Sequence, residues 1–266
     1  SASRIDKSFF NSNVLHGILS RVYLTTGNYA GAAAHAAQAR SGYALAGAEY
    51  VDGFDNMSAT EWIWAMPQQS DQSNYYFGAP HAQADHEVTS YQGTFINVDF
   101  FSLFSATDIR RAGTAATGAQ FYARYTLNPA SYLYICTRKF TFAFSSHFAL
   151  MRSAEMVLVE AEGKARTGDE AGAAALLLSL QQSRDASAVA SGNTGQALID
   201  EILVERRKEL YAELGVEWFD AKRLGTPITR TGNHRIMGDA SLTANDKRFF
   251  LKVPQREIDA NDNITD

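Results

Sequence analysis

The residues best suited to holding a ligand lie in one irregular stretch, residues 67–94. Three aromatic residues stand side by side in it: Tyr75, Tyr76 and Phe77. Sugar rings have apolar faces that stack on aromatic planes, while nearby Asn, Gln and Asp side chains bond the hydroxyl groups. Large, rigid rings also suit peptide ligands, because they give contact area at low entropic cost. We predict a ligand-binding loop formed by Asn74, Tyr75, Tyr76, Phe77, His81 and Tyr91.

The length of this stretch and its lack of a regular hydrophobic pattern favour a functional loop. It has no sustained apolar period, and such a length without regular structure inside a compact domain is often functional. Asp71 and Gln72 supply further polar groups beside the rings. The alternative is that individual rings are buried and fix the loop onto neighbouring helices, as aromatic residues often are.

The sequence gives little support for catalysis, metal binding or a cofactor. His81, Asp85, His86 and Glu87 are close together, but their spacing matches no zinc pattern, so no metal site is predicted. The nucleophile elbow, the dinucleotide fingerprint and the phosphate loop are all missing from the sequence. Paired carboxylates for glycoside cleavage stay open, because such pairs meet only in the fold. Cys136 has no cysteine partner and is expected to be a small buried residue. We predict a protein without enzymatic activity or cofactor.

Composition fits a folded domain that does not bind nucleic acid. The 266 residues are 45% hydrophobic, enough for a substantial core. The formal net charge is −5, from 24 Lys and Arg against 29 Asp and Glu. Nucleic-acid binding needs a basic footprint, which this balance does not provide. The sequence also has no stretch of the ~18 apolar residues typical of a membrane-spanning helix.

Two helical hairpins frame the irregular region. Apolar residues at helical spacing predict one hairpin over 9–39 and a second over 151–184, each broken by a glycine turn. The two hairpins share a similar sequence at the turn: TGNYAGAA at 26–33 and TGDEAGAA at 167–174. Such pairs resemble tetratricopeptide units, which stack to share a core and need about three repeats, so further helices must complete the layer. Between the hairpins, residues 61–66 could form a short strand, and 119–144 alternate aromatic and polar residues, compatible with one or two strands.

The densest pattern of charge is VERRKELYAELGVEWFDAKRLG at 204–225. Its apolar residues predict a helix over 196–214 with a stop at Gly215. Arg206 and Glu209 are three apart and can pair on the helix surface. One interpretation is a solvated charged face, as charge runs usually are. The other is that Arg and Asp side chains form buried pairs that lock the C-terminal segment to the helical core.

Three motifs in order resemble the SusD/RagB family. The first is ERRKEL followed by G-x-E-W-F-D-A-K-R, the second is the helical pair beginning MRSAE at 151, and the third is P-x-x-E-I-x-x-N at 254–261. Leu214, Gln181 and Glu217 depart from the usual family pattern. The resemblance implies a mainly α fold, an α-α superhelix of tetratricopeptide-like hairpins with long irregular loops and a few short strands. It also implies a set of structural signature residues: Glu205, Arg206, Arg207, Glu209, Trp218, Asp220 and Arg223.

The resemblance further implies a role in nutrient uptake. Family members are outer-membrane lipoproteins that capture a glycan, such as starch, or a peptide and deliver it to a SusC-type TonB-dependent transporter. A helical-repeat interaction module without a small ligand is the remaining alternative. We expect residues 1–266 to be a single domain that lacks its N-terminal portion and lipid anchor. Its parts would be the hairpin 9–39, the irregular region 41–150, the hairpin 151–184, and the signature helix with the C-terminal segment, 196–266.

Overall fold

The computed structural model describes residues 6–69, 71, 94–141, 143, 145–236, 241–244, 246–261 and 263. Its frame is built from two hairpins with the same turn chemistry. In α1 (Ser12–Thr25) and α2 (Tyr29–Ala39), Gly27 takes a left-handed φ of 79° and Asn28 caps α2 by accepting from the Gly31 N–H. In α6 (Ser153–Arg166) and α7 (Glu170–Arg184), Gly168 has φ 93° and Asp169 caps α7. The repeated sequence, Thr-Gly followed by Asn or Asp, therefore forms the same turn in both hairpins.

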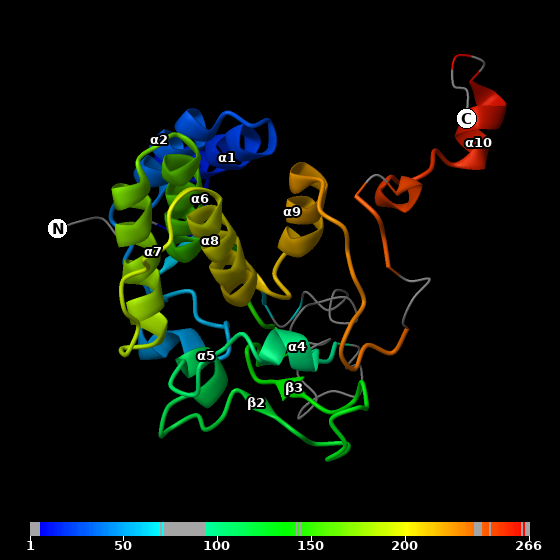
Figure 1. Cartoon of the computed structure of the whole chain (residues 1–266). Coiled ribbons are helices and arrows are strands. Elements are labelled where there is room, and N and C mark those ends of the chain that lie inside the picture. Colours follow the sequence, from blue (N-terminus) through cyan, green and yellow to red (C-terminus); the bar gives the residue numbers. More distant parts are fainter. Residues whose placement is uncertain are drawn as a thin grey trace.

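Small residues let the hairpins pack closely. The alanine face of α2 lies on α6, where a Cβ added at Gly163 would be only 2.6 Å from the Tyr29 carbonyl oxygen. On its other side α6 packs against α7 and α8 (Gly195–Leu210), and Figure 1 shows these helices side by side. Apolar side chains of the last three helices share one core, made of Ala154, Val157, Leu158, Ala161, Ala165, Ala173, Leu177, Leu180, Leu198, Ile199 and Ile202. The predicted mainly helical, tetratricopeptide-like fold is confirmed.

The chain between the hairpins leaves the frame and returns to it. β1 (Trp62–Met66) pairs antiparallel with β4 (Phe148–Arg152), and β4 runs directly into α6. A second short pair, β2 (Phe121–Tyr122) and β3 (Cys136–Thr137), lies at the opposite end of the molecule from α1 (Figure 1). The described part of this region also contains three short helical segments: η1 (Ala48–Val51), α4 (Val98–Phe101) and α5 (Ile109–Ala112). Cys136 is buried, as expected.

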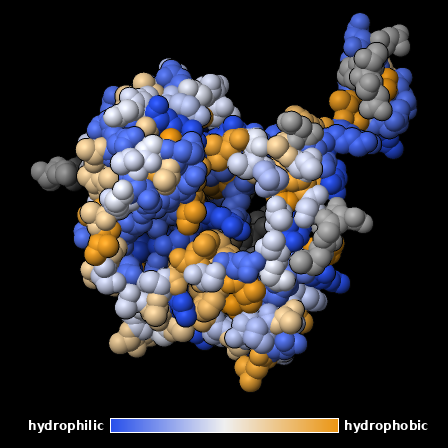
Figure 2. All heavy atoms as spheres, in the orientation of Figure 1, coloured by the Kyte–Doolittle hydropathy of each residue, from blue (hydrophilic) through white to orange (hydrophobic). Residues whose placement is uncertain are grey.

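The C-terminal segment leaves the frame after α8. α9 (Val216–Leu224) is followed by a loop, by η3 (Lys247–Phe249) and by α10 (Gln255–Ala260). Figures 1 and 2 show the last of these standing clear of the body, and α10 buries no side chain. Within the described residues, every helix is too short or too polar to cross a lipid bilayer.

Candidate functional site

The signature helix α8 is not a solvated charged face. Glu205, Arg206 and Glu209 are only 2%, 5% and 0% exposed, so the interpretation of this face as solvent-facing is wrong for these three residues. Arg207 does face solvent, where it pairs with the equally exposed Glu217 at 2.7 Å. Buried charges are costly unless they are paired and hydrogen-bonded. The helix must therefore meet its counter-charges inside the protein.

Glu209 lies at the centre of this buried charge network. One carboxylate oxygen accepts from Arg184 and Arg152, each at 2.9 Å, and the other from Arg184 and Arg110, each at 3.0 Å. Burial alone would raise the pKa of Glu209, but the guanidinium groups of Arg184, Arg152 and Arg110 hold it well below its usual range. Four charge-assisted bonds saturate the carboxylate, so it has a structural role.

The network continues from α8 into the β1–β4 pair. Arg152 also bonds Glu61, which comes directly before β1, and donates to Glu213 at 2.8 Å. The Lys139 ammonium donates to the Glu209 and Tyr211 carbonyl oxygens, each at 2.9 Å. Burial lowers the pKa of Lys139 to about 8, although the Glu213 carboxylate opposes this shift. These bonds tie the strands and the aromatic region to the C-terminal end of α8.

A second set of ion pairs fixes α9. Arg206 pairs with Asp220 at 2.7 Å rather than with Glu209, so the expected three-residue pairing on α8 does not form. Arg223 donates to both oxygens of Glu162 on α6, at 2.7 and 2.8 Å, and to Asp220 at 2.7 Å. Trp218 is half-buried and packs on Phe249, with ring centroids 4.9 Å apart. Glu205 pairs with Arg110 at 2.6 Å, so all seven signature residues make contacts within the protein. The Arg206–Asp220 and Arg223–Glu162 pairs lock α9 to the helical core, as the second interpretation expected.

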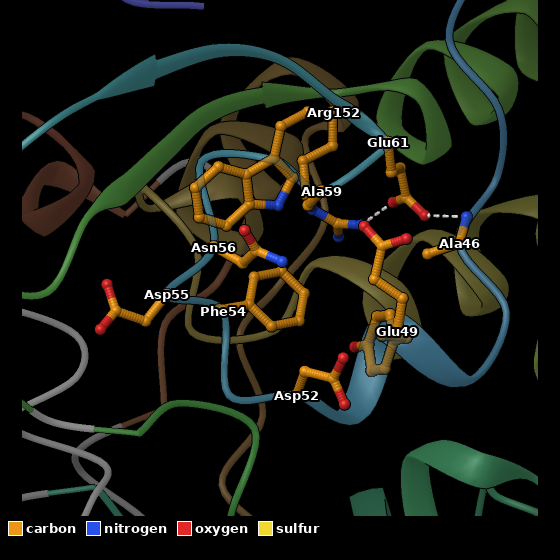
Figure 3. A pocket seen from close by; sticks show the side chains of 11 residues that line it. Ala46, Glu49, Asp52, Phe54, Asp55, Asn56, Ala59, Glu61 and Arg152 are labelled. Carbon is orange, nitrogen blue, oxygen red and sulfur yellow. Dashed lines mark hydrogen bonds and ion pairs between the residues drawn. The ribbon is translucent and has the colours of Figure 1, made fainter.

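Figure 3 shows a pocket lined mainly by side chains from η1, the loop that follows it and the start of β1. Among its charged lining residues, Arg152 and Glu61 bond each other, and Glu61 also accepts from the Ala46 N–H at 2.7 Å. Glu49 at the rim accepts from the Thr60 N–H at 2.7 Å. A ligand would have to displace these bonds. We therefore consider the pocket part of the network rather than a ligand site. It is lined by Ala46, Glu49, Tyr50, Asp52, Phe54, Asp55, Asn56, Ala59, Glu61, Trp62 and Arg152.

A more suitable surface adjoins the predicted ligand loop. Phe95 follows that loop directly in the sequence and meets two tyrosines edge to face, Tyr125 with centroids 5.8 Å apart and Tyr132 with centroids 6.0 Å apart. Tyr125 keeps half of its surface in solvent, and Phe95 and Tyr132 are half-buried. The rings thus support one another edge to face while each keeps part of its surface in solvent, where a ligand could reach it.

Two arginines flank these rings. The Arg124 guanidinium carbon lies 5.8 Å from the Tyr125 ring centroid, and that of Arg235 lies 5.3 Å from the Tyr132 ring centroid. Both arginines are exposed, and neither forms an ion pair within the part of the chain that the structure describes. We call Phe95, Arg124, Tyr125, Tyr132 and Arg235 the Phe95 surface.

Hydrogen bonds of two asparagines bring the three segments of this surface together. The Asn233 side chain is 5% exposed, donates to the Ser131 carbonyl oxygen at 2.7 Å, and accepts from the Val98 N–H at 3.0 Å. Asn97 donates to the Thr231 carbonyl oxygen at 2.8 Å. The loop after α9 is therefore fastened against the segments that carry Phe95 and Tyr132, which places Arg235 beside them.

The six predicted ligand residues, Asn74, Tyr75, Tyr76, Phe77, His81 and Tyr91, lie outside the described residues, so their placement stays a prediction. The same is true of His81, Asp85, His86 and Glu87, weighed as a metal site. The described residues contain no cluster of three or more possible metal ligands. Sequence reasoning did not select the Phe95 surface. Its one signal was the aromatic and polar alternation over 119–144, which was assigned to strands.

The SusD family model matches residues 143–266, and no curated protein matches the chain. A crystal structure of a SusD-like carbohydrate binding protein from Bacteroides vulgatus shares the fold with a TM-score of 0.84 at 24% identity, covering 99% of this chain and 61% of that one. A SusD superfamily protein from Bacteroides thetaiotaomicron gives a TM-score of 0.80 at 23% identity, covering 97% and 61%.

Another SusD superfamily protein, from Bacteroides fragilis, has a TM-score of 0.74 at 19% identity, covering 100% of this chain and 59% of that one. The chain therefore spans about three fifths of the length of these structures. The family match over residues 143–266 contains all three motifs and confirms the SusD/RagB prediction made from them. The solved structures show that the whole chain shares the SusD-like fold.

Proposed function

We propose that this chain belongs to a non-enzymatic glycan-binding protein for nutrient uptake, and that the Phe95 surface holds the ligand. The main support is the set of partly open rings, Phe95, Tyr125 and Tyr132, held on a framework cross-linked by buried ion pairs. The similarity in fold to a SusD-like carbohydrate binding protein agrees with this role. Rigid support matters because a prearranged surface loses little entropy when it binds.

In this proposal the loop before Phe95 extends the surface. Tyr75, Tyr76 and Phe77 would add stacking area, while Asn74, His81 and Tyr91 would bond hydroxyl groups. The full-length protein would sit at the outer-membrane surface on a lipid anchor and pass its ligand to a SusC-type TonB-dependent transporter. A peptide ligand is the alternative that the same rings would allow.

Calorimetry against a panel of glycans and peptides tests the proposal. Tyr125→Ala and Tyr132→Ala should each weaken binding of the preferred glycan about tenfold, the loss of roughly 1.4 kcal/mol of stacking. Phe9→Ala is the matched control, because Phe9 is 67% exposed and leads into α1, at the other end of the molecule (Figure 1). It should bind as the unchanged protein does.

Three results would contradict the proposal. Unchanged affinity in Tyr125→Ala, in Tyr132→Ala and in a triple alanine variant of Tyr75, Tyr76 and Phe77 would remove the assigned surface. Binding of peptides but not glycans would favour the peptide alternative. Release of shortened sugars from the bound glycan would show an enzyme rather than a binding protein.

A further inference from the structure

The chain carries an unusual local charge balance around the Phe95 surface. The whole protein is acidic, with a formal net charge of −5, yet residues 109–154 contain no Asp or Glu. The loop at 225–236, which brings Arg235 to the surface, contains none either. The cationic residues of the acid-free run are Arg110, Arg111, Arg124, Arg138, Lys139 and Arg152.

Half of these cations are already neutralised inside the protein. Arg110, Lys139 and Arg152 are buried and pair with the carboxylates of the charge network. Arg124, by contrast, is exposed beside Tyr125, and Arg235 from the second acid-free segment is exposed beside Tyr132. The surface therefore carries positive charge that the network does not use.

Two other exposed arginines are neutralised locally. Arg207 pairs with Glu217 at 2.7 Å, and Arg248 pairs with Asp246 at 2.6 Å. A carboxylate does lie near the Phe95 surface, on α4, but Asp99 accepts from the Thr231 hydroxyl at 2.6 Å and forms no ion pair with Arg124 or Arg235. The two arginines at the rings thus differ from Arg207 and Arg248 in forming no ion pair with any residue that the structure describes.

Arg138, also in the acid-free run, contacts β2. Its guanidinium carbon lies 3.8 Å from the Tyr122 ring centroid, and one of its N–H groups donates to the Ala119 carbonyl oxygen at 2.8 Å. Tyr122 is three residues from Tyr125. Arg138 is held in place by these contacts, so we assign it no part in binding the ligand.

We propose that the Phe95 surface takes anionic glycans, whose sugar rings stack on Phe95, Tyr125 and Tyr132 while Arg124 and Arg235 pair with their acid groups. The inference rests on the proposed glycan-binding function and names its ligand class. A guanidinium presents parallel N–H donors that match the two oxygens of a carboxylate or sulfate. A neutral glycan would use the rings but leave both arginines without a partner.

Matched polysaccharide pairs test the charge without changing the sugar chain. Polygalacturonate is compared with its methyl-esterified form, and dextran sulfate with dextran, by calorimetry at low and at moderate salt. The acidic member of at least one pair should bind tenfold or more tightly than its neutral partner, and added salt should weaken it. The pair with the larger difference tells whether carboxylate or sulfate is preferred.

Substitutions then assign the effect to the two arginines. Arg124→Gln and Arg235→Gln should each weaken the acidic glycan about fivefold or more and leave a neutral glycan unaffected. Arg256→Gln is the matched control, because Arg256 is exposed on α10, which stands clear of the body (Figure 1). It removes the same charge far from the rings and should change nothing. Thermal melting checks that all three variants fold.

These outcomes distinguish failure of the anionic ligand class from failure of the proposed glycan-binding function. Suppose that the neutral and acidic polysaccharides of each pair bind equally, and that Tyr125→Ala weakens both. This result would overturn the anionic ligand class and leave glycan binding in place. Equal weakening by Arg124→Gln, Arg235→Gln and Arg256→Gln would show general charge attraction and also overturn it. Binding of no glycan at all would overturn both.

Discussion

Glu209 on α8 and Arg184 at the end of α7 form a fully buried two-point ion pair, with Nε and Nη2 of the arginine 3.0 and 2.9 Å from the two carboxylate oxygens. The pair joins the second hairpin to the signature helix. Because Arg152 and Arg110 bond the same carboxylate, the strand β4 and the short helix α5 are attached at the same point. One residue thus links four elements that are distant in the sequence.

Glu209→Gln should destabilise the fold by about 3–5 kcal/mol, because it leaves buried guanidinium groups without their counter-charge. Urea unfolding followed by circular dichroism measures the change. Glu217→Gln is the matched control, since it breaks the exposed pair with Arg207 and should cost about 1 kcal/mol or less. Similar losses in the two variants would show that the network is not the main link between these elements.

Lys139 should make stability rise with pH in a defined window. Its pKa is about 8 in the folded protein against 10.5 for an ordinary lysine, so between these values the unfolded chain binds more protons. Stability rises with pH wherever the unfolded state binds more protons, here by at most about 3 kcal/mol. Tyr50 and Tyr211 do not oppose this below pH 10, because burial raises both of their pKa values.

Lys139→Met removes this titration while keeping a side chain of similar length. The stability difference between the natural protein and Lys139→Met should shift in favour of the natural protein as pH rises from 7 to 10. Urea midpoints at several pH values measure it. Parallel stability curves for the two proteins would contradict the prediction.

The helical frame could be predicted because its signals are local. Alanine stripes at helical spacing and the glycine turn followed by Asn28 or Asp169 lie within a few residues of each other. The structure places α1, α2, α6 and α7 within the ranges expected for the two hairpins. Turn chemistry and helical periodicity therefore sufficed for this part of the chain.

The charge network could not be predicted in the same way. A helix face rich in charge has the same local pattern whether water or protein covers it, and Arg110 is 99 residues from Glu209. The Phe95 surface could not be predicted for the same reason, since Tyr132 and Arg235 come together only where Asn233 holds the loop against Ser131. Both features depend on tertiary contacts that leave no periodic trace in the sequence.

Gly163 gives a test of the close approach between the hairpins. In an exposed helix, replacing glycine by alanine stabilises by about 1 kcal/mol. At this position the new Cβ would lie 2.6 Å from the Tyr29 carbonyl oxygen and 2.8 Å from the Ala33 Cβ, so α2 must move away from α6. Gly163→Ala should therefore destabilise by about 1–3 kcal/mol. Gly192→Ala is the control, because nothing lies within 4 Å of its added Cβ.

Thermal and urea unfolding of both variants decide between the two effects. If helix propensity outweighed packing, Gly163→Ala would be as stable as the natural protein or more so, and the hairpins would be shown to tolerate a wider spacing. A loss of stability in Gly163→Ala but not in Gly192→Ala would instead mean that α2 and α6 approach this closely only because Gly163 has no side chain. Because α6 also carries Glu162, which anchors Arg223 of α9, that loss should be accompanied by weaker docking of α9, measurable as faster amide exchange there.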